Sequence, residues 1–251
     1  MLFSLLQSLQ DGTIRSTLIM VLLSLPIILF SLSAHESAHG FVAYKCGDPT
    51  ARNLGRISLN PAKHFDPMGF LCMFLFGFGW AKPVPINTRN FKNPKAGMAI
   101  TAAAGPLSNL LIGVVSTILT ALTFTAFRST VGISNTEFRL YMLTTSDAPF
   151  YWYVLLALYF FFYLAAFMNF TLMFFNLIPI PPFDGSRIVT AFLPTNLYFK
   201  IMRYERQIMI GLLVVLFVLS RFFSFSLTGF LSDWLFDVLF KPFANLFSAI
   251  F

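Results

Sequence analysis

The feature that most limits the fold of this chain is an apolar segment that ends in ionisable residues. Residues 17–30 read TLIMVLLSLPIILF, and residues 31–41, SLSAHESAHGF, follow without a break. An α-helix that crosses a bilayer needs about 20 mainly apolar residues. An ionisable group at membrane depth is costly, and it usually marks a functional site. The segment therefore predicts a membrane helix that carries a functional site.

The composition extends this prediction to the whole chain, which has 251 residues, 57% hydrophobic and 11% charged. A soluble domain is about 25% charged. We therefore expect an all-α polytopic membrane protein with four to six membrane-embedded helical elements. It should form a single domain over residues 1–251, with a core at 15–206 and C-terminal helices at 207–251.

The expected elements follow from the apolar runs. Four runs are long enough to span the membrane, and three others predict a short interfacial helix, a re-entrant or interfacial segment, and an amphipathic or partly inserted helix. The spans are residues 15–44, 97–127, 149–178 and 207–227, and the other three segments are, in the same order, residues 1–12, 68–80 and 231–251.

Two short stretches between the first two spans are typical of β-strands. They are GRISLN at residues 55–60 and KPVPIN at residues 82–87. Pro83 and Pro85 cannot donate to a ladder, so the second stretch is expected at the edge of a small β-sheet. Such an edge could accept an unwound substrate by strand addition. A hairpin that only braces the two spans explains the pattern equally well.

The positive charges are unevenly distributed along the chain. The net charge is +7, and of seventeen Lys and Arg eight lie in residues 45–95 and four more in residues 187–206, but only two lie in residues 128–150. Loops rich in Lys and Arg stay on the cytoplasmic side of a membrane. We therefore expect residues 45–95 and 187–206 to lie in the cytoplasm. The protein should cross the membrane several times, interact with the lipid bilayer and bind no nucleic acid.

The sequence HESAH has the spacing of a zinc-binding motif. His35 and His39 are four residues apart, so they share one face of a helix, and Glu36 lies beside them. This is the H-E-x-x-H arrangement of zinc peptidases, in which the glutamate is the general base. The alternative is a pair of buried histidines with purely structural hydrogen bonds.

Catalytic zinc usually has three protein ligands and a water molecule. Asp184 is a candidate for the third ligand because it ends the run FFNLIPIPPFDG directly after the third span. A carboxylate on an unwound segment at membrane depth is tolerated only inside the protein or in a wet cavity. A metal would give it a partner. The alternative is a loop acid that caps the next helix.

Several motifs occur in one order between residues 35 and 188: HESAHG, GDPTARNLGRISLNPAKHFDPMG, GWAKPVPIN, AAGPLSNL and NLIPIPPFDGSRI. Together they resemble the site-2 protease family of intramembrane zinc metalloproteases, most closely its compact branch without a PDZ domain. The resemblance implies that His35, His39 and Asp184 bind the zinc ion and that Glu36 is catalytic.

The resemblance also implies that Asn109 and Asn176 flank the active site and hold the substrate backbone. From the residues alone, hydrogen bonds between helices explain these amides equally well. Asn109 follows Gly105-Pro106, where we expect a break in the second span. His64 is expected either to donate a hydrogen bond to the oxyanion or to face solvent.

The interpretation is an intramembrane zinc endopeptidase with one Zn²⁺ per chain. It would hydrolyse peptide bonds in or near transmembrane segments of a membrane protein or peptide, with the active site towards the cytoplasm. Glu36 would activate a zinc-bound water. The alternatives are a membrane zincin of another family with a glutamate as third ligand, a metal transporter, and a pseudoprotease scaffold. For the zincin, Glu205 is the candidate, because Glu137 is expected on the opposite side of the membrane.

Overall fold

The computed structural model describes residues 14–76, 79–131, 149–194 and 227–250, with isolated positions between 197 and 215. Among these residues, three helices are long and apolar enough to cross a membrane. They are α2 (Ile14–Lys45), α5 (Pro94–Val131) and α7 (Phe150–Asn176). They confirm helices at the first three predicted spans.

Shorter elements connect and follow these helices. Between α2 and α5 lie α3 (Thr50–Asn53), η1 (Pro61–Lys63), α4 (Pro67–Phe76) and η2 (Thr88–Asn90); α8 (Asp184–Thr190) follows α7, and α11 (Leu227–Ile250) lies near the C-terminus. The ten residues of α4 are too few to cross a bilayer, as expected for a re-entrant or interfacial segment.

Two of the predicted elements cannot be compared with the structure in full. The interfacial helix expected at residues 1–12 lies outside the described residues, and so does most of the fourth span expected at 207–227. The helix expected at 231–251 is confirmed as α11, which has 24 residues.

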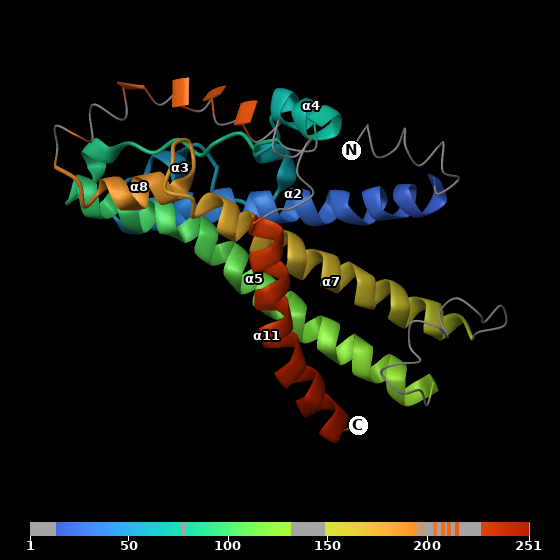
Figure 1. Cartoon of the computed structure of the whole chain (residues 1–251). Coiled ribbons are helices and arrows are strands. Elements are labelled where there is room, and N and C mark those ends of the chain that lie inside the picture. The colour runs from blue at the N-terminus through green and yellow to red at the C-terminus, as the bar shows by residue number, and fades with distance from the viewer. Residues whose placement is uncertain are drawn as a thin grey trace.

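Helix α5 is the centre of the fold. It packs against α2, α7, α8 and α11. Figure 1 shows α5 and α7 running side by side, with α11 crossing them, while α2 leaves the other two at an angle. The three long helices therefore come closest at one end, which is the end where α3 and α8 lie.

Small residues on α5 allow this close packing. A Cβ atom on Gly113 would lie 2.3 Å from the ring of Phe170 on α7. Phe170 is fully buried and packs with Ala166 and with Phe236 of α11. In a membrane, helices associate through such close van der Waals contact, because lipid chains are as apolar as the side chains. The glycine thus fixes the α5–α7 spacing.

The break expected at Gly105-Pro106 is wrong. Helix α5 runs through this point with Pro106 inside it. Prolines are tolerated in membrane helices because neighbouring helices and Ser or Thr side chains satisfy the freed backbone groups. The carbonyl that Pro106 leaves without its helical donor is that of Ala102, and α5 remains helical on both sides of it.

The small β-sheet is also wrong, because the described residues contain no strand. The stretch 82–87 is extended, but its backbone amides bond elsewhere. The Val84 amide donates to the Glu36 carboxylate at 2.8 Å, and the Asn87 amide donates to Asp48 at 2.7 Å. Side chains of α2 and the loop after it thus take the amides that a neighbouring strand would need.

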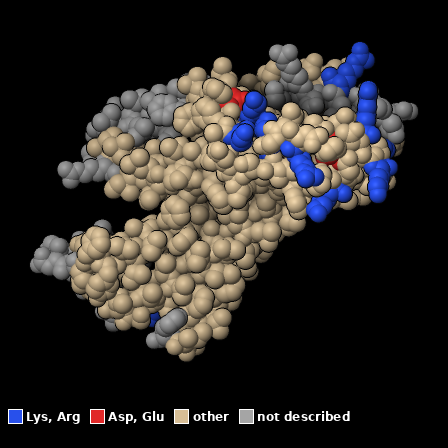
Figure 2. Space-filling model, turned by 180° about the vertical axis from the view of Figure 1, so that it is seen from behind, with Lys and Arg blue, Asp and Glu red and all other residues tan. Residues whose placement is uncertain are grey.

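The Lys and Arg residues of the three long helices lie only near the helix ends. In Figure 2 the Lys and Arg side chains gather at one end of the visible face, and the rest of this face is almost free of them. Many of the basic residues belong to residues 45–95, among them Lys45, Arg52, Lys92 and Lys95. Uncharged helix surfaces are what lipid tails require, and together with the three apolar helices they indicate a membrane protein.

Candidate metal centre

Two histidines of α2 and one aspartate of α8 meet at a single point. The Nε2 atoms of His35 and His39 lie 3.0 Å apart. Oδ2 of Asp184 lies 3.1 Å from the first and 3.3 Å from the second. His35 and His39 are both buried, and the Asp184 side chain is 15% exposed. The three predicted ligands therefore lie together.

The other nitrogen of each ring is held by the protein. His39 Nδ1 lies 2.7 Å from the backbone carbonyl of Thr101. A carbonyl oxygen can only accept, so Nδ1 carries the proton and Nε2 of the neutral ring is a bare acceptor. His35 Nδ1 lies 2.6 Å from Asn109 Oδ1. Metal-binding histidines almost always donate their second N–H in this way.

The donor set fits a small divalent cation such as zinc. With each Nδ1 holding its ring proton, the two Nε2 atoms and the Asp184 carboxylate are three acceptors facing one another. Asp184 Oδ2 is buried and has no hydrogen-bond partner among the described residues. Zinc–ligand bonds of roughly 2.0–2.1 Å in a tetrahedron separate the ligands by about 3.3 Å. The three observed distances, 3.0, 3.1 and 3.3 Å, are close to that value.

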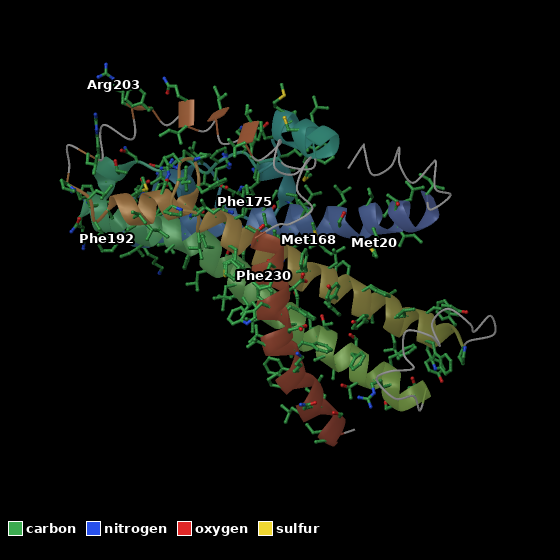
Figure 3. All side chains as sticks on the ribbon, viewed as in Figure 1. Met20, Met168, Phe175, Phe192, Arg203 and Phe230 are labelled. Carbon is green, nitrogen blue, oxygen red and sulfur yellow. The ribbon has the colours of Figure 1, made fainter. Side chains whose placement is uncertain are left out.

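The turn between α7 and α8 brings Asp184 to this point. A Cβ atom on Gly185 would lie 2.2 Å from the Leu177 carbonyl oxygen, so only glycine allows the chain to pass so close. The rings of Phe175, labelled in Figure 3, and Phe183 pack edge to face with centroids 4.3 Å apart. Asp184 lies in the first turn of α8, and no side chain caps this helix. The helix-cap alternative is therefore wrong.

Gly105 of α5 covers the metal site. A Cβ atom at this position would lie 2.5 Å from His35 Cε1 and 2.5 Å from both Cε1 and Nε2 of His39. No side chain fits at that distance, so glycine is the residue that allows α5 to approach both rings. The α5 backbone thus covers the two histidines.

Glu36 lies next to the ligands in sequence, but it is not part of the triad. One of its carboxylate oxygens, Oε2, accepts a hydrogen bond from the Val84 amide at 2.8 Å. The side chain is half-buried. The geometry therefore places a carboxylate beside the candidate metal site without making it a ligand.

Comparison with known proteins gives the family. The model of peptidase family M50 matches residues 23–219. The chain belongs to peptidase family M50. This M50 peptidase is 35% identical over 188 residues to the protein of Bacillus subtilis (strain 168) named "Putative zinc metalloprotease YwhC", and the match covers 75% of this chain and 77% of that protein. No solved structure matched. The M50 peptidase is thus a metalloprotease.

His64 of the M50 peptidase is buried, so the solvent-facing alternative is wrong. Its Nε2 lies 2.8 Å from the Ser58 carbonyl and 3.4 Å from Ser37 Oγ. Because a carbonyl cannot donate, Nε2 holds the proton, and Nδ1 of the neutral ring is an acceptor. Nδ1 has no hydrogen-bond partner in the described part of the chain. Donation to an oxyanion, which stays a prediction, would need the protonated ring.

The two asparagines of the M50 peptidase have different surroundings. Asn109 is fully buried, and its amide bonds both to His35 and to Asn169 at 2.9 Å. Asn176 is only half-buried and donates to the carbonyl of Leu172, one turn back in α7, at 2.9 Å. Contact with a substrate stays a prediction for both.

Sequence reasoning missed several residues of the site. Asn169 is an amide within the apolar run of α7, and its polarity at membrane depth could have marked it. Gly105 was within a recognised motif, but its contact with the rings has no signal in the sequence. Thr101 and Val84 act through their backbone groups. Their side-chain types therefore carry no information about these roles.

Proposed function

We propose that this M50 peptidase is an intramembrane zinc endopeptidase that hydrolyses peptide bonds in or near transmembrane segments of membrane proteins. The observation that carries the proposal is the position of the ligand set. His35 and His39 belong to a helix that is apolar enough to cross a membrane, and Asp184 completes the set from α8. Polar chemistry at this depth serves a substrate that is itself within the bilayer.

Zinc is the metal that best suits this donor set. Two imidazole nitrogens and one carboxylate oxygen are the ligands of a catalytic zinc site with an open fourth position. The relative named as a zinc metalloprotease supports the same choice. One ligand triad, formed by residues of a single chain, supports one zinc ion per chain. Bound zinc lowers the pKa of water to about 7 and polarises the scissile carbonyl.

The residues of this chain then perform the proton transfers. Glu36 removes a proton from the attacking water and donates it to the leaving amine as the peptide bond breaks. The Val84 amide bonds to one oxygen of this carboxylate and limits its rotation. Gly105 and the buried rings beneath it exclude bulk water from that side.

We further propose that the active site faces the cytoplasm. The His and Glu residues lie near the C-terminal end of α2, next to the basic residues 45–95. The positive-inside rule puts this end of the helix on the cytoplasmic side. Cleavage would then occur in the cytoplasmic half of the bilayer.

The other candidate functions have weaker support. Glu137 and Glu205, which a zincin with a glutamate ligand would need, lie outside the described residues, whereas Asp184 lies at the site. A pseudoprotease would have lost its general base, and Glu36 is present. Membership of a peptidase family also argues against a metal transporter.

Comparative proteomics of membrane fractions tests the proposal. Cells that express the native protein are compared with cells that express Glu36→Gln. We expect fragments with new termini inside transmembrane segments only with the native protein. Equal fragment sets, with both proteins present at the same level and loaded with zinc, would overturn the proposal.

A further inference from the structure

The orientation of His35 depends on a buried chain of side chains that joins three helices. Asn109 of α5 lies 2.6 Å from His35 Nδ1 of α2. It also lies 2.9 Å from Asn169 of α7. Asn109 and Asn169 are both fully buried. An amide in such surroundings needs partners at both its ends, because a lost hydrogen bond there costs its full desolvation.

The direction of each hydrogen bond in this series of side chains follows from the group at its far end, the backbone carbonyl of Ala165. Asn169 Nδ2 lies 2.8 Å from the backbone carbonyl of Ala165, which can only accept. The Asn169 amide is therefore oriented with Nδ2 towards Ala165 and Oδ1 towards Asn109. Asn109 must then donate through Nδ2, which leaves its Oδ1 facing His35 as an acceptor.

This series of hydrogen bonds determines which ring nitrogen of His35 carries the proton. Because Asn109 Oδ1 accepts, the His35 proton is on Nδ1 and the lone pair of Nε2 points towards His39 and Asp184. An asparagine in the opposite orientation would put the proton on Nε2, the atom that faces the metal site. The backbone carbonyl of Ala165 thus fixes the ligand state of His35 through two amides.

We propose that Asn109 is a positioning residue, which holds His35 in the tautomer and ring orientation that bind zinc, and that Asn169 holds Asn109. This inference rests on the zinc centre of the proposed function, but not on the identity of the peptide substrate. Only His35 depends on a side chain for its orientation, because the partner of His39 is a backbone carbonyl. Zinc affinity should therefore respond to substitution at position 109 and not at position 101.

Zinc affinity in the purified full-length protein provides the first test, by competition with a chelator. Asn109→Leu removes the acceptor, and we expect the zinc affinity to fall by roughly 10- to 100-fold, as for other partners of metal-binding histidines. Asn109→Asp keeps the acceptor towards His35 but loses the donor to Asn169, so it should restore only part of the affinity. Asn176→Leu is the matched control, because within the described residues the Asn176 side chain bonds to its own helix; it should keep the native affinity.

The tautomer itself provides the second test, by nitrogen NMR of protein labelled only at histidine. The chain has three histidines, so few ring signals need assignment. We expect the zinc-loaded native protein to show His35 and His39 protonated at Nδ1. Asn109→Leu should change the Nδ1 signal of His35 and leave that of His39 unchanged.

The outcomes are decisive even if Asn109→Leu does not fold. A free Nδ1 on His35 in the native, zinc-loaded protein would overturn the inference without any variant. So would native zinc affinity in Asn109→Leu. Both tests are made without a substrate, so their failure and the failure of the proposed proteolysis are distinguishable.

Discussion

The carboxylate of Glu36 accepts a hydrogen bond from the backbone amide of Val84 at 2.8 Å. Val84 lies on the extended stretch between α4 and α5, and Arg56 binds the carbonyls of Lys82 and Pro83 on the same stretch. The candidate general base is thus held by a segment that is far from it in sequence. The hydrogen bond that holds Glu36 involves none of the three candidate metal ligands.

Glu36→Gln should separate metal binding from catalysis. The amide oxygen of glutamine can still accept from Val84, but glutamine cannot take a proton from water. We expect zinc to remain bound and turnover of a transmembrane substrate to fall by at least about 10²-fold. Metal analysis and a cleavage assay in liposomes measure the two effects. A variant that cleaves at the native rate, with contaminating proteases excluded, would refute the role of Glu36.

Asp184→Asn should impair both properties, because an amide is a poorer zinc ligand than a carboxylate. We expect lower zinc content and lower activity, and complete loss of zinc when His35→Ala and His39→Ala are added. The native protein should contain about one zinc ion per chain. Removal of zinc by a chelator should abolish activity, and added zinc should restore it. Full zinc content in the triple variant would place the metal elsewhere.

Gly105→Ala should destroy the metal site for steric reasons. The new methyl group would lie 2.5 Å from atoms of both His35 and His39, so α5 or the rings must move. We expect most of the bound zinc to be lost. Gly113→Ala is the matched control on the same helix, because its methyl group would meet Phe170 and not the ligands. It should lower the thermal stability and retain zinc.

The membrane orientation can be tested by labelling introduced cysteines in intact cells. Native Cys46 and Cys72 are replaced first, since neither forms a disulfide. A cysteine at Arg52 should resist an impermeant thiol reagent, because the positive-inside rule places it in the cytoplasm. A cysteine at Thr136 should react. The reverse pattern would move the active site to the opposite side of the membrane.

Asp48 should make stability depend on pH. Burial alone raises the pKa of this carboxyl, but hydrogen bonds from Thr50, Asn87 and Asn90 outweigh that effect and hold its pKa below the ordinary value. A pKa that is lower in the folded state stabilises the protein above the unfolded pKa of about 3.9. This contribution is lost as pH falls through the folded pKa.

Asp48→Asn removes this contribution, and we expect a loss of roughly 1–3 kcal/mol at pH 7 from the unpaired donors. Thermal unfolding in detergent should show a large difference between the variant and the native protein at pH 7. The difference should shrink below about pH 4, where Asp48 is protonated in the unfolded state. A difference that is independent of pH would contradict the predicted charge effect.

The sequence was sufficient to predict that His35, His39 and Asp184 lie together, because zinc chemistry limits the residue types that can form such a site. His35 and His39 had the spacing of one helix face. Asp184 directly follows a membrane span, where a carboxylate needs a partner such as a metal ion. The strand at 82–87 failed for the opposite reason. Its amides bind Glu36 and Asp48, and local propensity contains no information about such distant side chains. The break at Gly105-Pro106 failed because a helix packed among other membrane helices tolerates an internal proline.

The contact between His39 and the Thr101 carbonyl has a consequence for comparative studies of this family. Every residue type has a backbone carbonyl, so position 101 can vary in evolution without any change to the partner of His39. A search for pairs of positions that change together would find no link between 39 and 101, although the two are in direct contact. Position 109 offers a side chain to His35, so we expect that half of the metal centre to leave a trace in an alignment and the other half to leave none.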